Sequence, residues 1–262
     1  MRIVVLVKPV PDPASGAERL GPDRRLDRAA SPAVVNGNDE YALEAALKLV
    51  EAHGGEVTLL SMAPANAPET LRKALAMGAT RGVHVTDPAL EGSCTVSTTK
   101  VLAAALEGLE FDLVLAGVDT SDGTAGVVPA GVAALRRLPY LSYAAKIEPD
   151  PDAGRVRVHR ISPTGFDVLE APMPAFISCT QLLGEPRYPS LKGIMAARSK
   201  EIETRSLADL GLDGAGVGGS VATTRVLDTT APAARAATRV VRGAPDEAAR
   251  EVVSLLAERR LI

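Results

Sequence analysis

The first 138 residues alternate between short apolar runs and segments with helical periodicity, and this order constrains the fold more than any other feature. The apolar runs fall at residues 4–8, 56–62, 82–87 and 111–118. In the first segment between them, Leu43, Ala46, Leu47 and Val50 have the spacing of one helical face. The alternation predicts an α/β fold with a doubly wound, mostly parallel sheet covered on both faces.

Helix boundaries follow from capping residues and glycines. We expect the first helix to end at Gly54, and the second to run from an N-cap at Asn66 to Gly78. A third helix is expected at residues 95–109, and a fourth begins near Gly123, with Pro129 tolerated in its first turns.

After residue 138 the pattern changes to short strands separated by proline and glycine turns, at residues 155–162, 165–171 and 174–180. These strands predict a β-hairpin addition whose last strand returns to the sheet. We therefore expect a nucleotide-binding α/β domain at residues 1–183, a loop at 184–200, and an extended C-terminal arm at 201–262. A final helix is expected at Asp246–Arg259.

The overall composition argues against several classes of protein. With 32 acidic and 29 basic residues among 262, the net charge of -3 gives no electrostatic case for binding nucleic acid or an anionic membrane. The first apolar run is too short for a signal peptide or a membrane span, and direct membrane insertion is not expected. Cys94 and Cys179 lie in no CxxC or zinc motif, so no metal is expected and a reducing, cytoplasmic location is predicted.

Ligands of open parallel sheets bind beyond the carboxyl ends of the strands, where three loops are expected to meet. Two of these loops are "VKPVPD" at residues 7–12 and "SMAPANAPE" at 61–69. The third, "AGVDTSDGTAG" at 116–126, leads into a helix and contains three glycines, which favours a phosphate site. A glycine-rich turn with an Asx cap remains the alternative.

Motifs of catalysis are absent from the sequence, which contains no nucleophile elbow, no Walker A run and no H-E-x-x-H. Gly214, Gly216 and Gly219 match G-x-G-x-x-G, but no strand precedes them and no helix is expected to follow. The sequence therefore predicts a nucleotide pocket without catalytic residues, in a protein that is not an enzyme.

Four separated blocks resemble the beta subunit of electron-transferring flavoprotein, over nearly the full length of the chain. They are "VLVKPVPD" at the start, "NGNDEYALEAAL" with "RKALAMGATRGVHV", the "AGVDTSDG" loop, and "EPRYPSLKGIMAARSKEIE" at residues 185–203. The resemblance implies an adenine-nucleotide hydrolase-like fold with a structural AMP. It also implies a heterodimer with an alpha subunit, which carries the redox FAD and on which the C-terminal arm packs.

The resemblance also implies a place in fatty acid oxidation. Electrons would come from acyl-CoA dehydrogenase-type donors and pass through the alpha-subunit FAD to a membrane quinone oxidoreductase. Two alternatives stay open. "NDEYALE" resembles electron-bifurcating members that hold a second FAD in place of AMP, whereas "EPRYP" and "TSDGTAG" resemble the others. The second alternative is a stand-alone adenine-nucleotide hydrolase-like enzyme. Such enzymes carry an S-G-G-x-D-S loop after the first strand, whereas this chain has "KPVPDP" there.

The resemblance carries two sets of site residues. Residues 184–200 resemble the family's partner recognition loop, with Leu191 as the anchor and Ile194 and Met195 as its apolar neighbours. The implied nucleotide contacts are Leu6, Asn36, Gly37, Asn38, Asp39, Met62, Gly117, Val118, Asp119, Thr120, Ser121, Asp122, Gly123, Thr124, Ala125, Gly126, Val127 and Val128.

Overall fold

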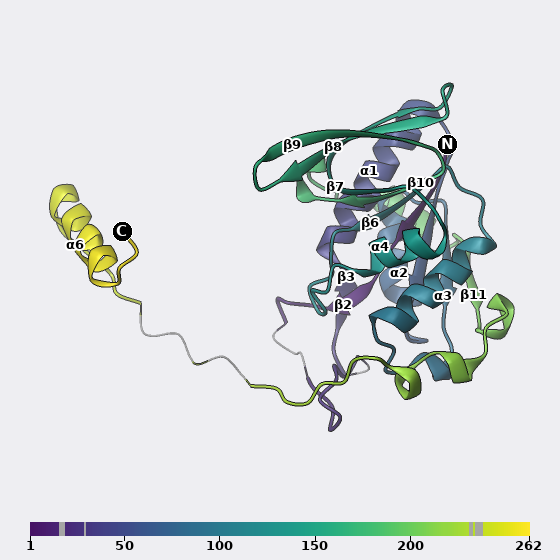
Figure 1. Ribbon diagram of the computed structural model, residues 1–262, viewed down its shortest axis with the longest axis horizontal. Helices are drawn as coiled ribbons and strands as arrows, with labels where there is room; N and C mark the ends of the chain where they lie inside the picture. Colours follow the sequence, from purple (N-terminus) through teal and green to yellow (C-terminus); the bar gives the residue numbers. More distant parts are fainter. Residues whose placement is uncertain (16–18, 29, 231–232, 234–237) are drawn as a thin grey trace. The chain divides into compact units, whose positions relative to one another are not determined.

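The computed structural model describes residues 1–15, 19–28, 30–230, 233 and 238–262 of the chain. These residues form two compact units, Met1–Leu227 and Asp228–Ile262, each of which is described by itself. Figure 1 shows the ribbon of both.

The first unit is built on a nine-stranded sheet with the order β11-β5-β4-β1-β6-β10-β7-β8-β9. The strands from β11 to β7 are parallel, and β8 and β9 are antiparallel additions beside β7. The predicted mostly parallel sheet is confirmed. The strands are β1 (Arg2–Leu6), β4 (Glu56–Met62), β5 (Arg81–Val85), β6 (Leu113–Gly117), β7 (Tyr140–Asp150), β8 (Arg155–Ser162), β9 (Gly165–Pro172), β10 (Ala175–Cys179) and β11 (Ile202–Arg205).

Helices cover both faces of this sheet. Ile3 and Val5 of β1 pack into an apolar layer beneath the first two helices, while Val4 packs into a second layer on the opposite face. Both faces of β1 are therefore buried, which explains its continuous apolar sequence. In Figure 1, α3 and α4 lie nearer the viewer than α1. The helices are α1 (Gly37–His53), α2 (Pro68–Met77), α3 (Thr95–Glu107), α4 (Val128–Leu135) and α5 (Leu191–Ala197).

Two predicted helix starts are wrong. The N-cap of α2 is Ala67 and not Asn66, because the helix begins one residue later than expected, at Pro68. The fourth helix begins at Val128 and not near Gly123. Thr124 and Gly126 have φ angles of 43° and 62°, and these left-handed conformations cannot continue into a right-handed helix.

A small antiparallel ribbon follows β1, where the sequence predicted only a loop. Its strands are β2 (Pro9–Pro11) and β3 (Ala33–Val35). The ribbon ends next to Asn36, the N-cap residue of α1. It therefore carries the chain from the end of β1 to the start of α1.

The division between the two units falls after Leu227, whereas the sequence led us to expect an arm from residue 201. The difference has a backbone cause, because β11 pairs with the edge strand β5 from Ile202 to Arg205. Leu207 and Val217 are then buried against the layer under α3. Residues 201–227 are thus held by strand pairing and by a few apolar anchors, which composition alone does not reveal.

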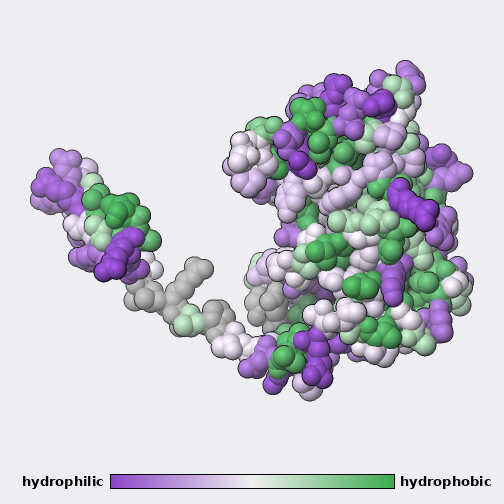
Figure 2. Space-filling view, in the orientation of Figure 1, coloured by the Kyte–Doolittle hydropathy of each residue, from purple (hydrophilic) through white to green (hydrophobic). Residues whose placement is uncertain are grey.

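The second unit contains the helix α6 (Pro245–Glu258), which agrees within one residue with the predicted helix. Val252 and Val253 are about half exposed within this structure. Apolar side chains of this helix gather together in Figure 2, apart from its charged residues. Among the residues that the structure describes, no helix combines the length and the apolar character needed to cross a membrane.

Candidate functional site

The carboxyl edge of the sheet has a switch point between β1 and β6. From β1 the chain proceeds through α1 to β4 on one side, and it later returns through α3 to β6 on the other. The connections lie on opposite faces, so the loops after β1 and β6 separate at this point. Ligands of doubly wound folds bind in the crevice that such a separation creates.

Asp39 holds the two sides of this crevice together. Its Oδ2 atom accepts the backbone N–H of Lys8 at 2.9 Å, and its Oδ1 atom accepts that of Gly117 at 3.1 Å. Burial raises the pKa of the Asp39 carboxyl to about 7, although the N–H donors oppose this by favouring the charged form. One carboxyl of α1 therefore fixes the ends of β1 and β6.

Two asparagines extend this connection into residues 117–128, which we call the nucleotide loop after the contacts that the sequence analysis expected there. The Asn36 amide donates to the backbone oxygen of Asp119 at 2.9 Å and accepts the N–H of Ser121 at 3.2 Å. The Asn38 amide donates to the carboxylate of Asp119. The structure thus brings together two segments that the sequence analysis named, residues 36–39 and the nucleotide loop.

A cluster of charges around the buried Asp122 carboxylate lies beside these contacts. The Asp122 side chain is 3% exposed and pairs with Lys8 Nζ at 2.9 Å and with the Arg28 guanidinium. Burial disfavours the Asp122 carboxylate, but the two cations outweigh it and lower its pKa to about 2. Sequence reasoning missed both Lys8 and Arg28. One feature of the sequence could have indicated Lys8, which is the charged residue that ends an apolar run, whereas nothing in the sequence indicated Arg28.

The remainder of the nucleotide loop, residues 123–128, is largely exposed. The N–H groups of Ala125, Gly126 and Val127 donate to no protein acceptor within the described part of the chain. Successive free N–H groups with alternating backbone handedness form a concave anion site in many proteins. Any anion held here would contact the loop, since α4 begins only at Val128.

Leu6 and Met62 were also expected at the site. Each ends its strand, and both side chains pack with the apolar layer under α3. The Leu6 side chain is buried in this layer, whereas that of Met62 is only partly buried.

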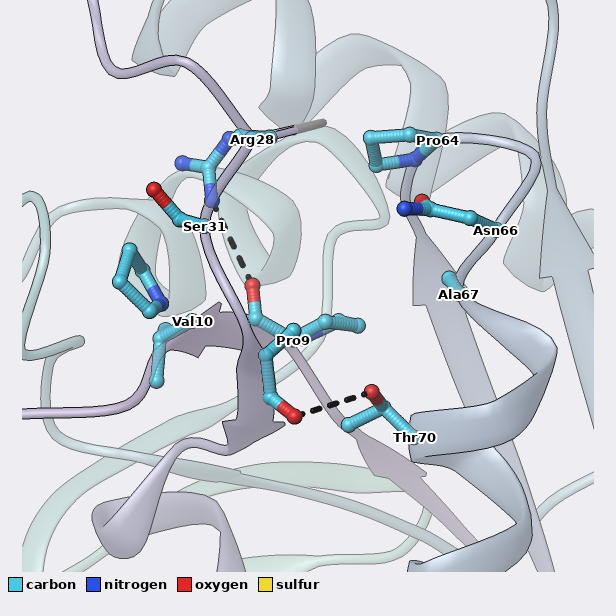
Figure 3. A pocket seen from close by; sticks show the side chains of 10 residues that line it. Pro9, Val10, Arg28, Ser31, Pro64, Asn66, Ala67 and Thr70 are labelled. Atoms are coloured by element: carbon cyan, nitrogen blue, oxygen red, sulfur yellow. Dashed lines mark hydrogen bonds between the residues drawn. The ribbon is translucent and has the colours of Figure 1, made fainter. Parts of the chain in front are cut away.

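Next to the charge cluster, a pocket lies between the β2–β3 ribbon and the start of α2 (Figure 3). Arg28 borders it and donates to the Pro9 carbonyl at 3.4 Å, while Thr70 donates to the Ala33 carbonyl at 3.4 Å. Pro64 and Asn66 of the expected second ligand loop line the same pocket. Arg28 therefore connects this pocket with the cluster around Asp122.

The recognition loop, residues 184–200, contains the short helix α5 and lies away from the crevice. Leu191, Ile194 and Met195 are 76%, 46% and 63% exposed, respectively. Their i, i+3 and i+4 spacing places them on one face of the helix. Ala197 is the buried residue of α5. The first unit thus presents a small apolar face that it does not cover itself.

Comparisons with known proteins identify the family of the chain. A family model for the electron transfer flavoprotein domain matches residues 24–210. The chain is 38% identical over 266 residues to the electron transfer flavoprotein subunit beta of Mycobacterium tuberculosis, which covers 99% of each chain. It is 34% identical to the same subunit of Clostridium acetobutylicum and 33% identical to the caffeyl-CoA reductase-Etf complex subunit CarD of Acetobacterium woodii, over 100% of each chain.

The family model covers residues 36–39, residues 117–128 and the recognition loop, and the beta subunits align from one end of the chain to the other. The chain therefore belongs to the beta subunits of the electron transfer flavoproteins.

Proposed function

We propose that the chain is the AMP-holding and partner-docking subunit of a heterodimeric electron transfer flavoprotein. The observation that carries the proposal is the crevice between β1 and β6, where Asn36, Asn38 and Asp39 fix the nucleotide loop beside free N–H groups. These groups suit a phosphate and a ribose. The chain would act as an electron carrier subunit without catalytic residues of its own.

The nucleotide would occupy the contacts expected from the sequence. Its phosphate would lie on residues 123–128, with Lys8 and Arg28 supplying positive charge nearby. Asp122 would not receive it, since both of its oxygens pair with these cations. A second FAD in place of AMP is the alternative, and it would use the same loop for its adenosine diphosphate part.

Docking of electron donors is proposed for the exposed face of α5, with Leu191 as its anchor. An apolar patch surrounded by polar residues suits a transient protein contact. The proposed donors are acyl-CoA dehydrogenase-type enzymes of fatty acid oxidation, and the proposed acceptor is a membrane quinone oxidoreductase. Electrons would pass through the FAD of the alpha subunit. The cytoplasm is the proposed compartment, since Cys94 and Cys179 are both free thiols.

The second unit is proposed to bind the alpha subunit through α6, whose Val252 and Val253 need an apolar surface. Co-expression with a flavoprotein alpha subunit tests this part. We expect deletion of residues 228–262 to abolish co-purification while the first unit remains folded. Unchanged co-purification would contradict the role of α6.

Release of the bound nucleotide by heat, followed by mass determination, tests the crevice. One AMP per heterodimer together with one FAD is expected. Two FAD molecules and no AMP would establish the alternative in which a second FAD occupies the crevice. A heterodimer with one FAD and no second nucleotide would overturn the crevice as a nucleotide site.

A further inference from the structure

Charged side chains hold the recognition loop against α1 and α2, and Arg187 makes the contacts with α1. Its Nε atom donates to Glu44 Oε2 at 2.8 Å, and its Nη2 atom donates to Glu51 Oε2 at 3.1 Å. Both carboxylates belong to α1, so one planar guanidinium spans two turns of that helix. The Glu44 side chain is 5% exposed and that of Arg187 is 34% exposed, so water and salt screen their pair only in part.

A second anchor lies at the other end of the recognition loop. The Lys200 ammonium donates to the carbonyls of Leu75 and Ala79, at 3.0 and 2.6 Å, where α2 ends. In return Arg72 of α2 donates to the Ala197 carbonyl at 2.7 Å, at the end of α5. Cations at the end of a helix stabilise the carbonyl groups of its last turn, and Lys200 and Arg72 do so at the ends of α2 and α5.

Between the anchors, α5 rests directly on α2. A Cβ atom added to Gly193 would lie 2.4 Å from the Ala76 carbonyl oxygen, so only glycine permits this approach. The Ser190 hydroxyl caps α5 by accepting the Gly193 N–H at 3.0 Å. A helix of seven residues does not persist alone in water, and α5 buries little apolar surface. Polar contacts therefore determine its position.

We propose that Arg187 and Lys200 are positioning residues that hold α5 in one orientation, ready to receive an apolar pocket of the electron-donating protein. This inference rests on the proposed docking function of α5. Neither residue needs to touch the partner. Each acts by removing the conformational freedom that the loop would otherwise lose on binding, and such preorganisation increases affinity without adding contacts.

The test uses the complete heterodimer and a purified acyl-CoA dehydrogenase reduced with its acyl-CoA substrate. Arg187→Ala should raise the KM for the heterodimer about tenfold and leave kcat within about twofold, because docking and not electron transfer is affected. Arg187→Lys keeps the charge beside Glu44 but cannot span both carboxylates, so an intermediate KM is expected. Lys200→Met should also raise KM.

Two further variants keep the test decisive. Glu51→Gln removes one end of the Arg187 contact at an exposed position, so the fold is retained even where Arg187→Ala fails to fold. Glu107→Gln is the matched control, because it breaks an exposed ion pair with Arg136 that joins α3 and α4, on the opposite face of the sheet from α5. We expect Glu51→Gln to raise KM about threefold and Glu107→Gln to leave it unchanged.

Hydrogen exchange of the free heterodimer provides a readout that does not depend on the donor. Amides of residues 191–198 should exchange faster in Arg187→Ala and Glu51→Gln than in the wild type. Faster exchange with an unchanged KM would overturn the positioning role. An unchanged KM in Leu191→Ala would instead overturn the docking function itself, so the two failures can be told apart.

Discussion

The ammonium of Lys8 lies 2.9 Å from the carboxylate of Asp122, and this ion pair joins the loops after β1 and β6 across the crevice. Lys8 is partly exposed and Asp122 is buried, so the pair is screened less than a surface pair. Arg28 completes the cluster from the chain that enters β3. Three segments distant in sequence are thus connected by one carboxylate.

The first prediction concerns this carboxylate. Asp122→Asn should lower the free energy of unfolding by about 1–2 kcal/mol at pH 7, a figure reduced because both cations are about one-third exposed. The folded pKa of about 2 lies below the unfolded value of about 3.9, so this stability is present above pH 4 and is lost as the pH falls towards 2. Urea unfolding of the wild type and of Asp122→Asn at pH 7 and pH 3 measures this difference in the free energy of unfolding. A difference of equal size at both pH values would contradict the assignment of this stability to Asp122.

Asp39 should have the opposite pH dependence. Its folded pKa of about 7 lies above the unfolded value of about 3.9, so the folded state binds more protons between these values. Its contribution to stability is full below pH 4 and decreases as the pH rises through 7. We expect the free energy of unfolding to fall by about 1 kcal/mol per pH unit between pH 5 and 7. Asp39→Asn should remove this slope, and a slope that persists in the variant would exclude Asp39 as its source.

The third prediction compares two glycines at the crevice. A Cβ atom on Gly117 would lie 2.6 Å from the Cβ atom of Asn38, whereas one on Gly37 would meet nothing within 4 Å. Gly117→Ala should therefore cost about 1–3 kcal/mol through overpacking, and it should reduce the nucleotide content of the purified heterodimer. Gly37→Ala is the matched control and should leave stability unchanged or slightly raised. Thermal melts of both variants test the difference, and equal melting temperatures would contradict it.

A similar comparison tests the nucleotide loop. Gly126 has a φ of +62°, which an alanine adopts only with strain of about 1 kcal/mol. Gly154 has a φ of +64° in the turn between β7 and β8, and a Cβ there would meet nothing within 4 Å, so an alanine carries the same strain outside the nucleotide loop. Gly126→Ala should lower AMP occupancy by distorting the free N–H groups, while Gly154→Ala should retain it. Full occupancy in both variants would place the phosphate elsewhere.

These glycines also show how far the sequence could predict the site. Residues 117–128 were recognisable because they follow a buried strand at a sheet edge, whereas residues 36–39 were named only through the family resemblance. The structure brings both segments together. The start of α4 was misplaced because two left-handed residues, Thr124 and Gly126, interrupt a segment with helical composition. Arg28 could not be found, since its partner Asp122 lies 94 positions further along the chain. Periodicity reports local structure and burial, but it does not report which distant charges meet.

The last prediction concerns Leu191, the first residue of α5, which is 76% exposed. Burying one leucine side chain in a partner is worth roughly 1.5–3 kcal/mol, so Leu191→Ala should weaken docking of an acyl-CoA dehydrogenase about ten- to a hundredfold. The melting temperature, the nucleotide content and the flavin spectrum should not change, because this side chain lies outside the core of the first unit.

Leu135→Ala is the matched control, since Leu135 is 57% exposed on α4, which packs on the opposite face of the sheet from α5. Its substitution should alter neither stability nor docking. Salt provides a second criterion. The contact made by Leu191 is apolar, so the affinity lost in Leu191→Ala should remain lost at high ionic strength. Charged side chains such as Lys192 act mainly on the association rate, and salt screens their effect. A large fall in melting temperature, with electron transfer from the dehydrogenase unaffected, would show that Leu191 stabilises its own chain and does not dock a partner.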